Sequence, residues 1–109
     1  MSTFEQFQEI DIRVGTVRAA RLHPTARKPS VQLDIDFGPE GIKRSSAQLT
    51  KLYEPSALVG RQVVAVINFP PRRIADFVSE VLVLGAMLPN DTVVLLRPDR
   101  VVENGLRIG

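Results

Sequence analysis

The segment Asn68-Phe-Pro-Pro-Arg-Arg-Ile-Ala-Asp76 contains the side chains best suited to contact a ligand. Its two arginines, Arg72 and Arg73, carry planar cationic groups that match phosphates and carboxylates. Two adjacent prolines fix φ and remove two backbone donors, so we expect a stiff loop that continues neither flanking strand. Fixed cations beside apolar groups suit a nucleic acid or an extended peptide and offer little to catalysis. The apolar side chains around the arginines are Phe69, Ile74 and Phe77.

Few other residues could support chemistry. Cysteine is absent and His23 is the single histidine, which removes disulfides, thiolate metal sites, thiol nucleophiles and imidazole pairs. Asp34 and Asp36 point to one face of an expected strand, but without a nucleophile they are interpreted as its solvated face. His23, beside a proline, is interpreted as a loop side chain. We therefore expect no catalytic residue, no metal site and no cofactor, and predict that the protein is not an enzyme.

Size and composition predict one small domain over residues 1–109. The chain has 109 residues, of which 44% are hydrophobic and 6% aromatic, as in an ordinary globular domain packed on aliphatic side chains. No apolar run approaches the roughly 20 residues that span a bilayer, and the N-terminus lacks the basic and apolar regions of a signal peptide. We expect a cytoplasmic protein with no membrane insertion.

Arginine dominates the basic residues. Eleven of the 14 lysines and arginines are arginine, and the formal net charge is +2. Any one of them is most simply explained as solvated surface charge, but their grouping along the chain favours a patch that contacts phosphates. The candidate nucleic-acid contacts are Arg18, Arg21, Arg27, Lys28, Lys43 and Arg44.

Hydrophobic periodicity predicts the elements that position these side chains. Phenylalanines three apart predict a short amphipathic helix over about residues 3–9. A long strand is expected from Ile12, with a β-bulge where the alternation changes phase at Gly15. After a loop over 23–29, residues 31–37 alternate strictly between apolar and polar, which indicates a strand with one buried face.

The second half of the chain predicts a barrel. A turn over 38–41 precedes a strand over 42–46, and residues 48–53 and 54–59 are predicted to be helical. Three strands, a helix and two strands is the order of the OB-fold, a five-stranded Greek-key barrel whose face and loops bind oligonucleotides and other extended ligands. The fold class predicted is therefore an all-β barrel with short helices. The remaining expected elements are strands over 61–67, 79–86 and 92–96, a turn at 89–91 and a mixed tail over 97–109.

Several short motifs resemble those of the tRNA-binding domain family, which includes the C-terminal domain of bacterial methionyl-tRNA synthetases and free-standing dimeric tRNA-binding proteins. They are Asp11-Ile-Arg-Val-Gly15, Ala26-Arg-Lys-Pro29, Gly60 before a valine strand, and Asn68 with the proline-basic loop and Ser79-Glu80. A narrower set is similar to the CsaA-type export chaperones within that family. This set is Ile35-Asp-Phe-Gly38, Ser45-Ser-Ala-Gln48, residues 68–75, Ser79-Glu-Val-Leu-Val-Leu-Gly85, Asp99-Arg100, Asn104-Gly105 and Arg107-Ile-Gly109.

The resemblance implies an OB-fold homodimer, with the helix near residues 3–9 and the tail over 97–109 contributing to the subunit contact. CsaA-type proteins are described as chaperones that hold exported precursors unfolded and bind peptides in grooves near the dimer interface. The implied partners are a second copy of the chain and unfolded export precursors or peptides, with the export machinery and tRNA as further candidates. The alternative function is recognition of folded tRNA through a basic face of the barrel.

Two departures from the tRNA-binding relatives favour the export role. This chain has Arg44-Ser-Ser-Ala47 where those relatives usually have isoleucine-valine-serine-glycine. It has Ser79-Glu-Val-Leu82 where they have serine-glutamate-glycine-methionine. The resemblance places both positions on the face that contacts nucleic acid in the family, so it supports RNA binding less directly than it supports the fold and dimerisation.

The resemblance and the residue types together predict two sets of contacts. The serine pair has an equally good structural explanation as a helix N-cap, and the aromatic residues of the proline loop have one as packing. The candidate peptide contacts are Ser45, Ser46, Gln48, Asn68, Phe69, Pro70, Arg72, Arg73, Ile74 and Phe77. The candidate dimer contacts are Phe4, Phe7, Val81, Val83, Arg107 and Ile108.

Overall fold

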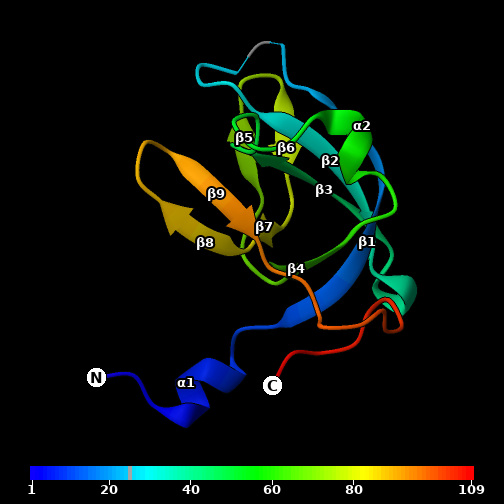
Figure 1. The fold of residues 1–109 in the computed structure, drawn as a ribbon. Helices are drawn as coiled ribbons and strands as arrows, with labels where there is room; N and C mark the ends of the chain where they lie inside the picture. The colour runs from blue at the N-terminus through cyan, green and yellow to red at the C-terminus, as the bar shows by residue number, and fades with distance from the viewer. Residues whose placement is uncertain (25) are drawn as a thin grey trace.

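Five strands of the computed structural model, which describes residues 1–24 and 26–109, form one sheet in the order β3-β2-β1-β4-β7 (Figure 1). All neighbouring pairs are antiparallel. The N–H groups of Glu80 and Val81 donate to the carbonyl oxygen of Arg44, so the chain before β7 lies against β3 and nearly closes a barrel. The predicted OB-fold is confirmed. The strands are β1 (Ile12–Leu22), β2 (Val31–Asp36), β3 (Ile42–Ala47), β4 (Gln62–Val66) and β7 (Leu82–Val83).

Strict alternation in β2 places a row of apolar side chains at the centre of the core. Val31, Leu33 and Ile35 are fully buried, as is Phe37 directly after the strand. The polar residues between them are partly exposed, as expected for a strand with one solvated face. All of β4 is buried within this single chain, so neither face of this strand needs a partner subunit to cover it. A 3₁₀ helix, η1 (Gly38–Glu40), occupies the predicted turn.

The bulge in β1 is real, but its predicted position at Gly15 is wrong. The register with β2 shifts between Val17 and Ala19 instead. Gly15 serves close packing: a Cβ atom there would lie 2.6 Å from Ile35 Cγ2 and 2.8 Å from the Phe37 ring. The glycine therefore lets β1 approach the core row of β2, and the change of phase around it does not mark the bulge. The loop expected over 23–29 is confirmed for its described part, and Thr25 lies outside the described residues.

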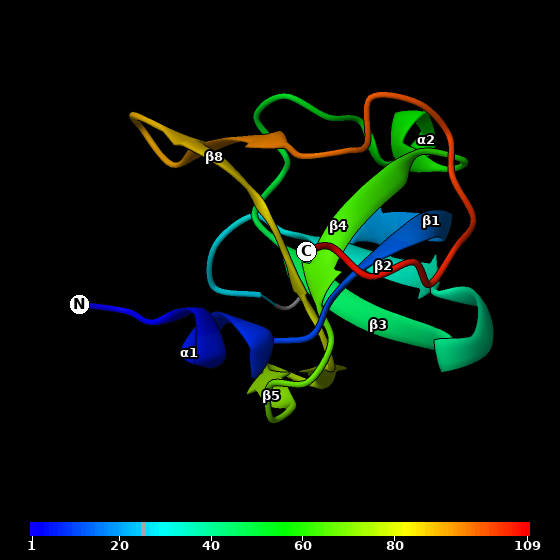
Figure 2. The same ribbon diagram turned by 90° about the horizontal axis from the view of Figure 1, so that it is seen from below.

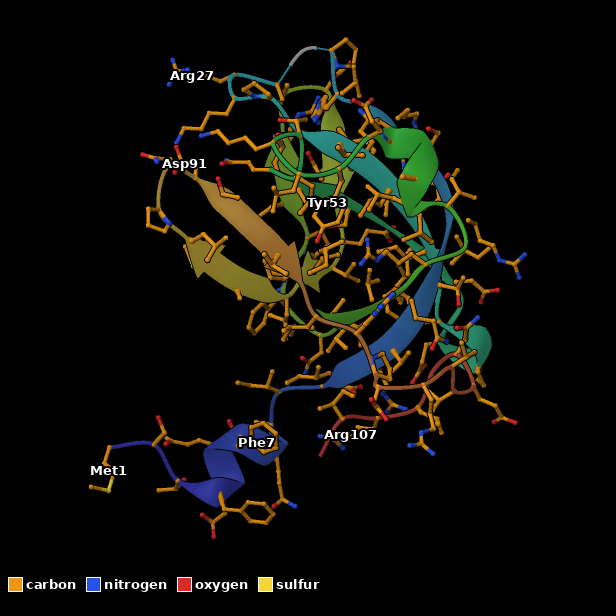
Figure 3. All side chains as sticks on the ribbon, viewed as in Figure 1. Met1, Phe7, Arg27, Tyr53, Asp91 and Arg107 are labelled. Atoms are coloured by element: carbon orange, nitrogen blue, oxygen red, sulfur yellow. The ribbon has the colours of Figure 1, made fainter. Side chains whose placement is uncertain are left out.

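The predicted helix over residues 48–53 is wrong. The single helix between β3 and β4 is α2 (Pro55–Leu58), which begins after Glu54 with a proline in its first turn. Leu49 is buried in the core, and the Tyr53 hydroxyl accepts a hydrogen bond from the Leu95 N–H at 3.0 Å; Figure 3 shows the Tyr53 ring beside the strands. Leu49 and Tyr53 each make their own contacts with the barrel. These tertiary contacts are stronger than the helical propensity of residues 48–53.

Two small hairpins extend from the barrel. The segment after the prolines, predicted as a stiff loop that continues neither flanking strand, is a hairpin in which β5 (Arg72–Ile74) pairs with β6 (Phe77–Ser79). This hairpin is separate from the five-stranded sheet. The predicted strand over 79–86 is split, because its end belongs to β8 (Gly85–Leu88), which pairs with β9 (Thr92–Leu95) across the predicted turn at 89–91. Figure 2 shows the β8 hairpin and the β5 hairpin on opposite sides of the view.

The N-terminal helix α1 (Phe4–Gln8) is confirmed and stands away from the barrel (Figures 1 and 2). Thr3 caps it: the Thr3 side chain accepts from the Gln6 N–H, and the Gln6 side chain accepts from the Thr3 N–H. None of its residues is buried. The tail lies along β1, where the Ile108 N–H donates to the Ile12 carbonyl oxygen at 2.8 Å. Among the described residues, no helix has the length and apolar character needed to cross a membrane.

Candidate functional site

A groove of about 610 Å³ lies between the two hairpins, over β3 and β7. Its apolar floor and far wall come from β7, β8 and β9, with Met87 at the rim and Leu95 below it. The opposite wall is formed by the proline loop and β5. The groove brings together seven of the ten predicted peptide contacts: Ser45, Ser46, Gln48, Phe69, Pro70, Arg72 and Ile74.

The serine hydroxyls of the groove are occupied by bonds within the chain. Ser45 is fully buried and its Oγ donates to the Val81 carbonyl oxygen at 3.1 Å. Ser46 Oγ lies 3.0 Å from His23 Nδ1, and the Ser46 N–H donates to Ser79 Oγ at 3.1 Å. Both serines lie in β3, so the alternative explanation as a helix N-cap is wrong. The polar side chains facing the groove therefore mostly hold its walls together.

The two arginines of β5 point to opposite faces of the strand, because side chains alternate along it. Arg72 lines the groove together with Ile74, whereas Arg73 does not. Both are exposed, and within the described residues neither has an ion pair. Glu80 also lines the groove, and its carboxylate accepts from the Arg44 N–H at 3.0 Å. Arg72 is thus the free cation beside an apolar groove in the described part of the chain.

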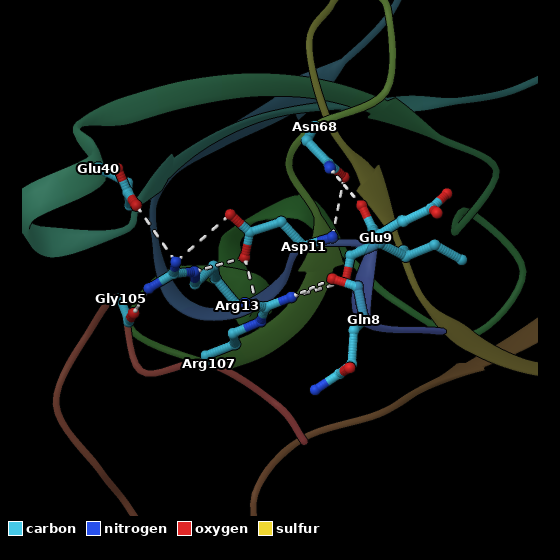
Figure 4. Close-up of polar contacts among 9 residues, drawn as sticks. Gln8, Glu9, Asp11, Arg13, Glu40, Asn68, Gly105 and Arg107 are labelled. Carbon is cyan, nitrogen blue, oxygen red and sulfur yellow. Dashed lines mark hydrogen bonds and ion pairs between the residues drawn. The ribbon is translucent and has the colours of Figure 1, made fainter. Parts of the chain in front are cut away.

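Three predicted peptide contacts lie outside the groove. Arg73 is one of them. Asn68 joins the loop to the N-terminal segment: its Oδ1 accepts from the Asp11 N–H at 2.9 Å and its Nδ2 donates to the Glu9 carbonyl oxygen at 2.8 Å (Figure 4). Phe77 is 2% exposed, with its ring 4.2 Å from the Arg44 guanidinium. Asn68 and Phe77 therefore hold the loop in place.

Sequence reasoning missed His23. Its side chain is fully buried, its ring lies 5.4 Å from that of Phe77, and its Nε2 lies 3.5 Å from Asp76 Oδ1. A histidine beside a proline in a loop gives no local signal of burial, because the contacts come from residues more than 20 positions away. No group of three or more histidine, cysteine or acidic residues in the described chain is placed to hold a metal ion.

The candidate nucleic-acid contacts are not one free patch. Arg18 donates to Asp36 at 2.5 Å, and this bond, followed by one from the Gly38 N–H, lowers the pKa of Asp36. Arg21 pairs with Asp34 at 3.3 Å. Cross-strand residues share a face of the sheet, and Lys43 lies opposite Ile35 in the register of β2 and β3, so Lys43 is on the other face from these arginines.

Other basic residues have different surroundings. Arg44 is held by the Phe77 ring and lies 3.9 Å from Asp34. Arg27 and Lys28 are exposed in the loop after β1. Lys28 also borders a smaller hollow of about 180 Å³ that shares Gln48 with the groove. Arg27 and Lys28 are thus more available to a phosphate than the arginines of β1.

The candidate dimer contacts fall into two groups. Phe4 and Phe7 are 69% and 38% exposed on α1, and Figure 3 shows Phe7 on the helix away from the barrel. Val81 is 5% exposed in the core and Val83 packs against that core. The phenylalanines are therefore free to meet a second subunit, whereas the two valines already pack within their own chain.

The two tail residues of the set hold the N-terminal segment in place. Arg107 donates to the Gln8 carbonyl oxygen at 2.6 Å (Figure 4), and Ile108 is bonded to β1 through its N–H. Nearby, Arg13 donates to Asp11 at 2.6 Å, which is the main reason that the pKa of Arg13 is raised. The C-terminal tail thus fixes the position from which α1 leaves the barrel.

The strand order, the helix between β3 and β4 and the groove define an OB-fold domain. The chain belongs to the tRNA-binding domain family, whose model, described as "Putative tRNA binding domain", matches residues 12–107. The chain is 51% identical to the chaperone CsaA from Bacillus anthracis str. Ames, with a TM-score of 0.96 over 100% of this chain and 99% of that one. It is 46% identical to the CsaA chaperone protein from Picrophilus torridus, with a TM-score of 0.93 over the whole of both chains.

Longer relatives contain the same domain. The chain is 39% identical over 105 residues to a methionine–tRNA ligase from Methanothrix thermoacetophila. This match covers 96% of the chain but only 15% of the ligase. The chain therefore spans about a seventh of the curated ligases that it matches.

Proposed function

We propose that the protein is a homodimeric chaperone of the CsaA type that binds extended segments of unfolded export precursors. The observation that carries the proposal is the groove, which collects residues from β3, the proline loop and β5 beside the exposed cation of Arg72. An apolar channel with one cation at its wall suits an extended segment that is apolar and acidic. The likeness to two chaperones over the whole chain supports the same function.

Dimerisation is part of this proposal. The exposed phenylalanines of α1 form an apolar surface on a helix that buries nothing within its own chain. Such a surface is stabilised when a second copy covers it. We place the protein in the cytoplasm, acting by binding and without catalysis, where unfolded precursors and the export machinery would be its partners.

A titration against two ligands tests the proposal. Purified protein is mixed with an unfolded secretory precursor and, separately, with total tRNA, over a range of salt concentrations. Precursor binding that persists at high salt, with weak tRNA binding, is expected, because apolar contacts in the groove are not screened. Tight tRNA binding with no precursor binding would overturn the proposal.

The alternative function is recognition of folded tRNA, and the family match over residues 12–107 favours it. Its contacts would come from the exposed Arg27 and Lys28 and from the arginines of the outer sheet face. Binding through phosphates releases counterions, so the affinity would fall steeply as salt rises. The same titration therefore separates the two functions.

A further inference from the structure

The side chain of His23 joins segments that are far apart in the sequence. His23 directly follows β1, and its Nδ1 lies 3.0 Å from Ser46 Oγ in β3. Its Nε2 lies 3.5 Å from Asp76 Oδ1 in the turn of the β5–β6 hairpin. The imidazole has no exposed surface, whereas the Asp76 side chain is 72% exposed. The buried ring therefore meets the hairpin turn from the inside, and among the described residues its Nε2 makes no hydrogen bond. A buried polar ring in such a position links the hairpin turn to the barrel.

Phe77, the next residue after Asp76, completes this link. Its ring is 5.4 Å from that of His23 and 4.2 Å from the guanidinium of Arg44 in β3. The turn of the hairpin is thus held through Phe77, which contacts the Arg44 guanidinium and meets the His23 ring at a tilt of 56°. At the other end of β6, Ser79 Oγ accepts the Ser46 N–H, so the hairpin is bound to β3 at both ends.

The position of this hairpin decides the shape of the groove. β5 and β6 have three residues each, and a two-stranded hairpin of this size is only marginally stable by itself. Its geometry must therefore come from contacts with the barrel. Arg72 and Ile74, on β5, line the groove, and they move with the hairpin.

We infer that His23 is a positioning residue for the groove: it holds the β5–β6 hairpin against β3, so that Arg72 and Ile74 are already in place when a peptide binds. This inference rests on the proposed function, because it assigns the hairpin to peptide binding. Because the hairpin is already ordered in the free protein, binding does not have to order it. This lowers the entropic cost of binding and raises the affinity for the peptide. His23 itself does not contact the ligand.

Three variants test the inference. His23→Ala removes the hydrogen bond to Ser46, the approach of Nε2 to Asp76 and the ring itself. His23→Asn places an amide near the position of Nδ1 and can keep the contact to Ser46. Arg72→Ala removes the groove cation, and it is combined with His23→Ala to form a double-mutant cycle. The probe is a short fluorescein-labelled peptide of leucine, serine and aspartate, and hydrogen exchange of the amides of β5 is measured in the same proteins.

The expected result is a loss of affinity of about tenfold for His23→Ala, with His23→Asn within about threefold of the wild type. In the Arg72→Ala background, His23→Ala should cost clearly less than in the wild type, because the cation it positions is gone. Exchange should accelerate in β5 and stay unchanged in β2. Thermal unfolding shows whether His23→Ala folds. If it does not, the peptide affinity of His23→Asn and its amide exchange in β5 relative to β2 decide whether the inference holds.

Other results overturn the inference. Wild-type affinity in His23→Ala would do so, as would equal losses in both backgrounds, which indicate an effect that does not pass through Arg72. If the wild type itself does not bind the peptide, the proposed function fails. The role of His23 then depends on the exchange data alone, and unchanged exchange in β5 of His23→Ala would refute it.

Discussion

The guanidinium of Arg44 lies 4.2 Å from the centre of the Phe77 ring. The sequence placed these two residues in different sites, Arg44 among phosphate contacts and Phe77 among peptide contacts. In the structure they contact each other and hold the β5–β6 hairpin on the barrel. Cations over aromatic faces contribute about 0.5–2 kcal/mol, so this pair stabilises the wall of the groove. Arg44 therefore stabilises the fold, whereas Arg72 lines the groove and is free to contact a ligand.

Arg72→Glu should weaken binding of an apolar, acidic peptide by about five- to tenfold, because an attraction is replaced by a repulsion at the groove wall. Arg73→Glu is the matched control, since this side chain has the same charge and is also exposed but does not line the groove. Fluorescence anisotropy with a labelled peptide measures both. Equal effects of the two substitutions would contradict the assignment of Arg72.

Replacing Phe4 and Phe7 together by alanine should convert the proposed dimer into a monomer. Burying one phenylalanine side chain contributes about 1.5–3 kcal/mol, and each subunit would lose two. Sedimentation velocity at micromolar protein concentration measures the change. Ile42→Ala, at a residue 63% exposed on β3, is the control and should leave the dimer intact. A monomeric wild type would refute the prediction.

For the tRNA alternative, log affinity should fall less steeply with log salt in the Arg27→Gln, Lys28→Gln double variant. The magnitude of the slope should decrease by about two, one for each phosphate that is no longer neutralised. Arg18→Gln with Arg21→Gln should lower it less, because these arginines already pair with aspartates. A filter-binding titration with total tRNA gives the slopes. The tRNA alternative loses its basis if neither pair changes the slope.

Ser45→Ala should lower the free energy of unfolding by about 1 kcal/mol, because the buried Val81 carbonyl oxygen loses one of its two hydroxyl donors and keeps only Ser79 Oγ at 3.3 Å. Urea denaturation measures this change. Ser56→Ala is the control: Ser56 is exposed in α2, and the change should stay within about 0.5 kcal/mol. A Ser45→Ala protein with unchanged stability would show that the hydroxyl is not needed inside the barrel.

The pair of Arg18 and Asp36 predicts a pH dependence of stability. The pKa of Asp36 is lowered in the folded protein, first by the bond from Arg18 and then by the Gly38 N–H. The folded state therefore gains stability above the ordinary aspartate pKa of about 4, and this gain is lost as the pH falls through the lower folded value.

Arg18→Gln should reduce that gain, so its stability should decline less between pH 5 and pH 2 than that of the wild type. Urea denaturation at several pH values measures the difference. Arg100→Gln is the control, because Arg100 and its partner Asp99 are both largely exposed. Parallel stability curves for the wild type and Arg18→Gln would show that this bond does not contribute.

Features that depend on neighbouring residues could be predicted from the sequence alone. Alternation over residues 31–37 predicted β2 and its buried row, and phenylalanines three apart predicted α1. The order of strands and the helix before β4 predicted the OB-fold, and the local motifs predicted the family. Seven groove residues were also found, because they belong to two short segments with ligand-binding chemistry. Each of these patterns involves residues that are close together in the sequence.

Features that depend on distant residues arise only in the folded chain. The bulge falls near Arg18 and not at Gly15, and Gly15 instead fits against Ile35 and Phe37, which follow it by 20 residues or more. Residues 48–53 are not helical, because Leu49 and Tyr53 contact the barrel separately. The burial of His23 and the contact of Arg44 with Phe77 require β1, β3 and the hairpin to meet. A chain's local pattern fixes which side chains can be buried, but closure of the barrel selects their partners.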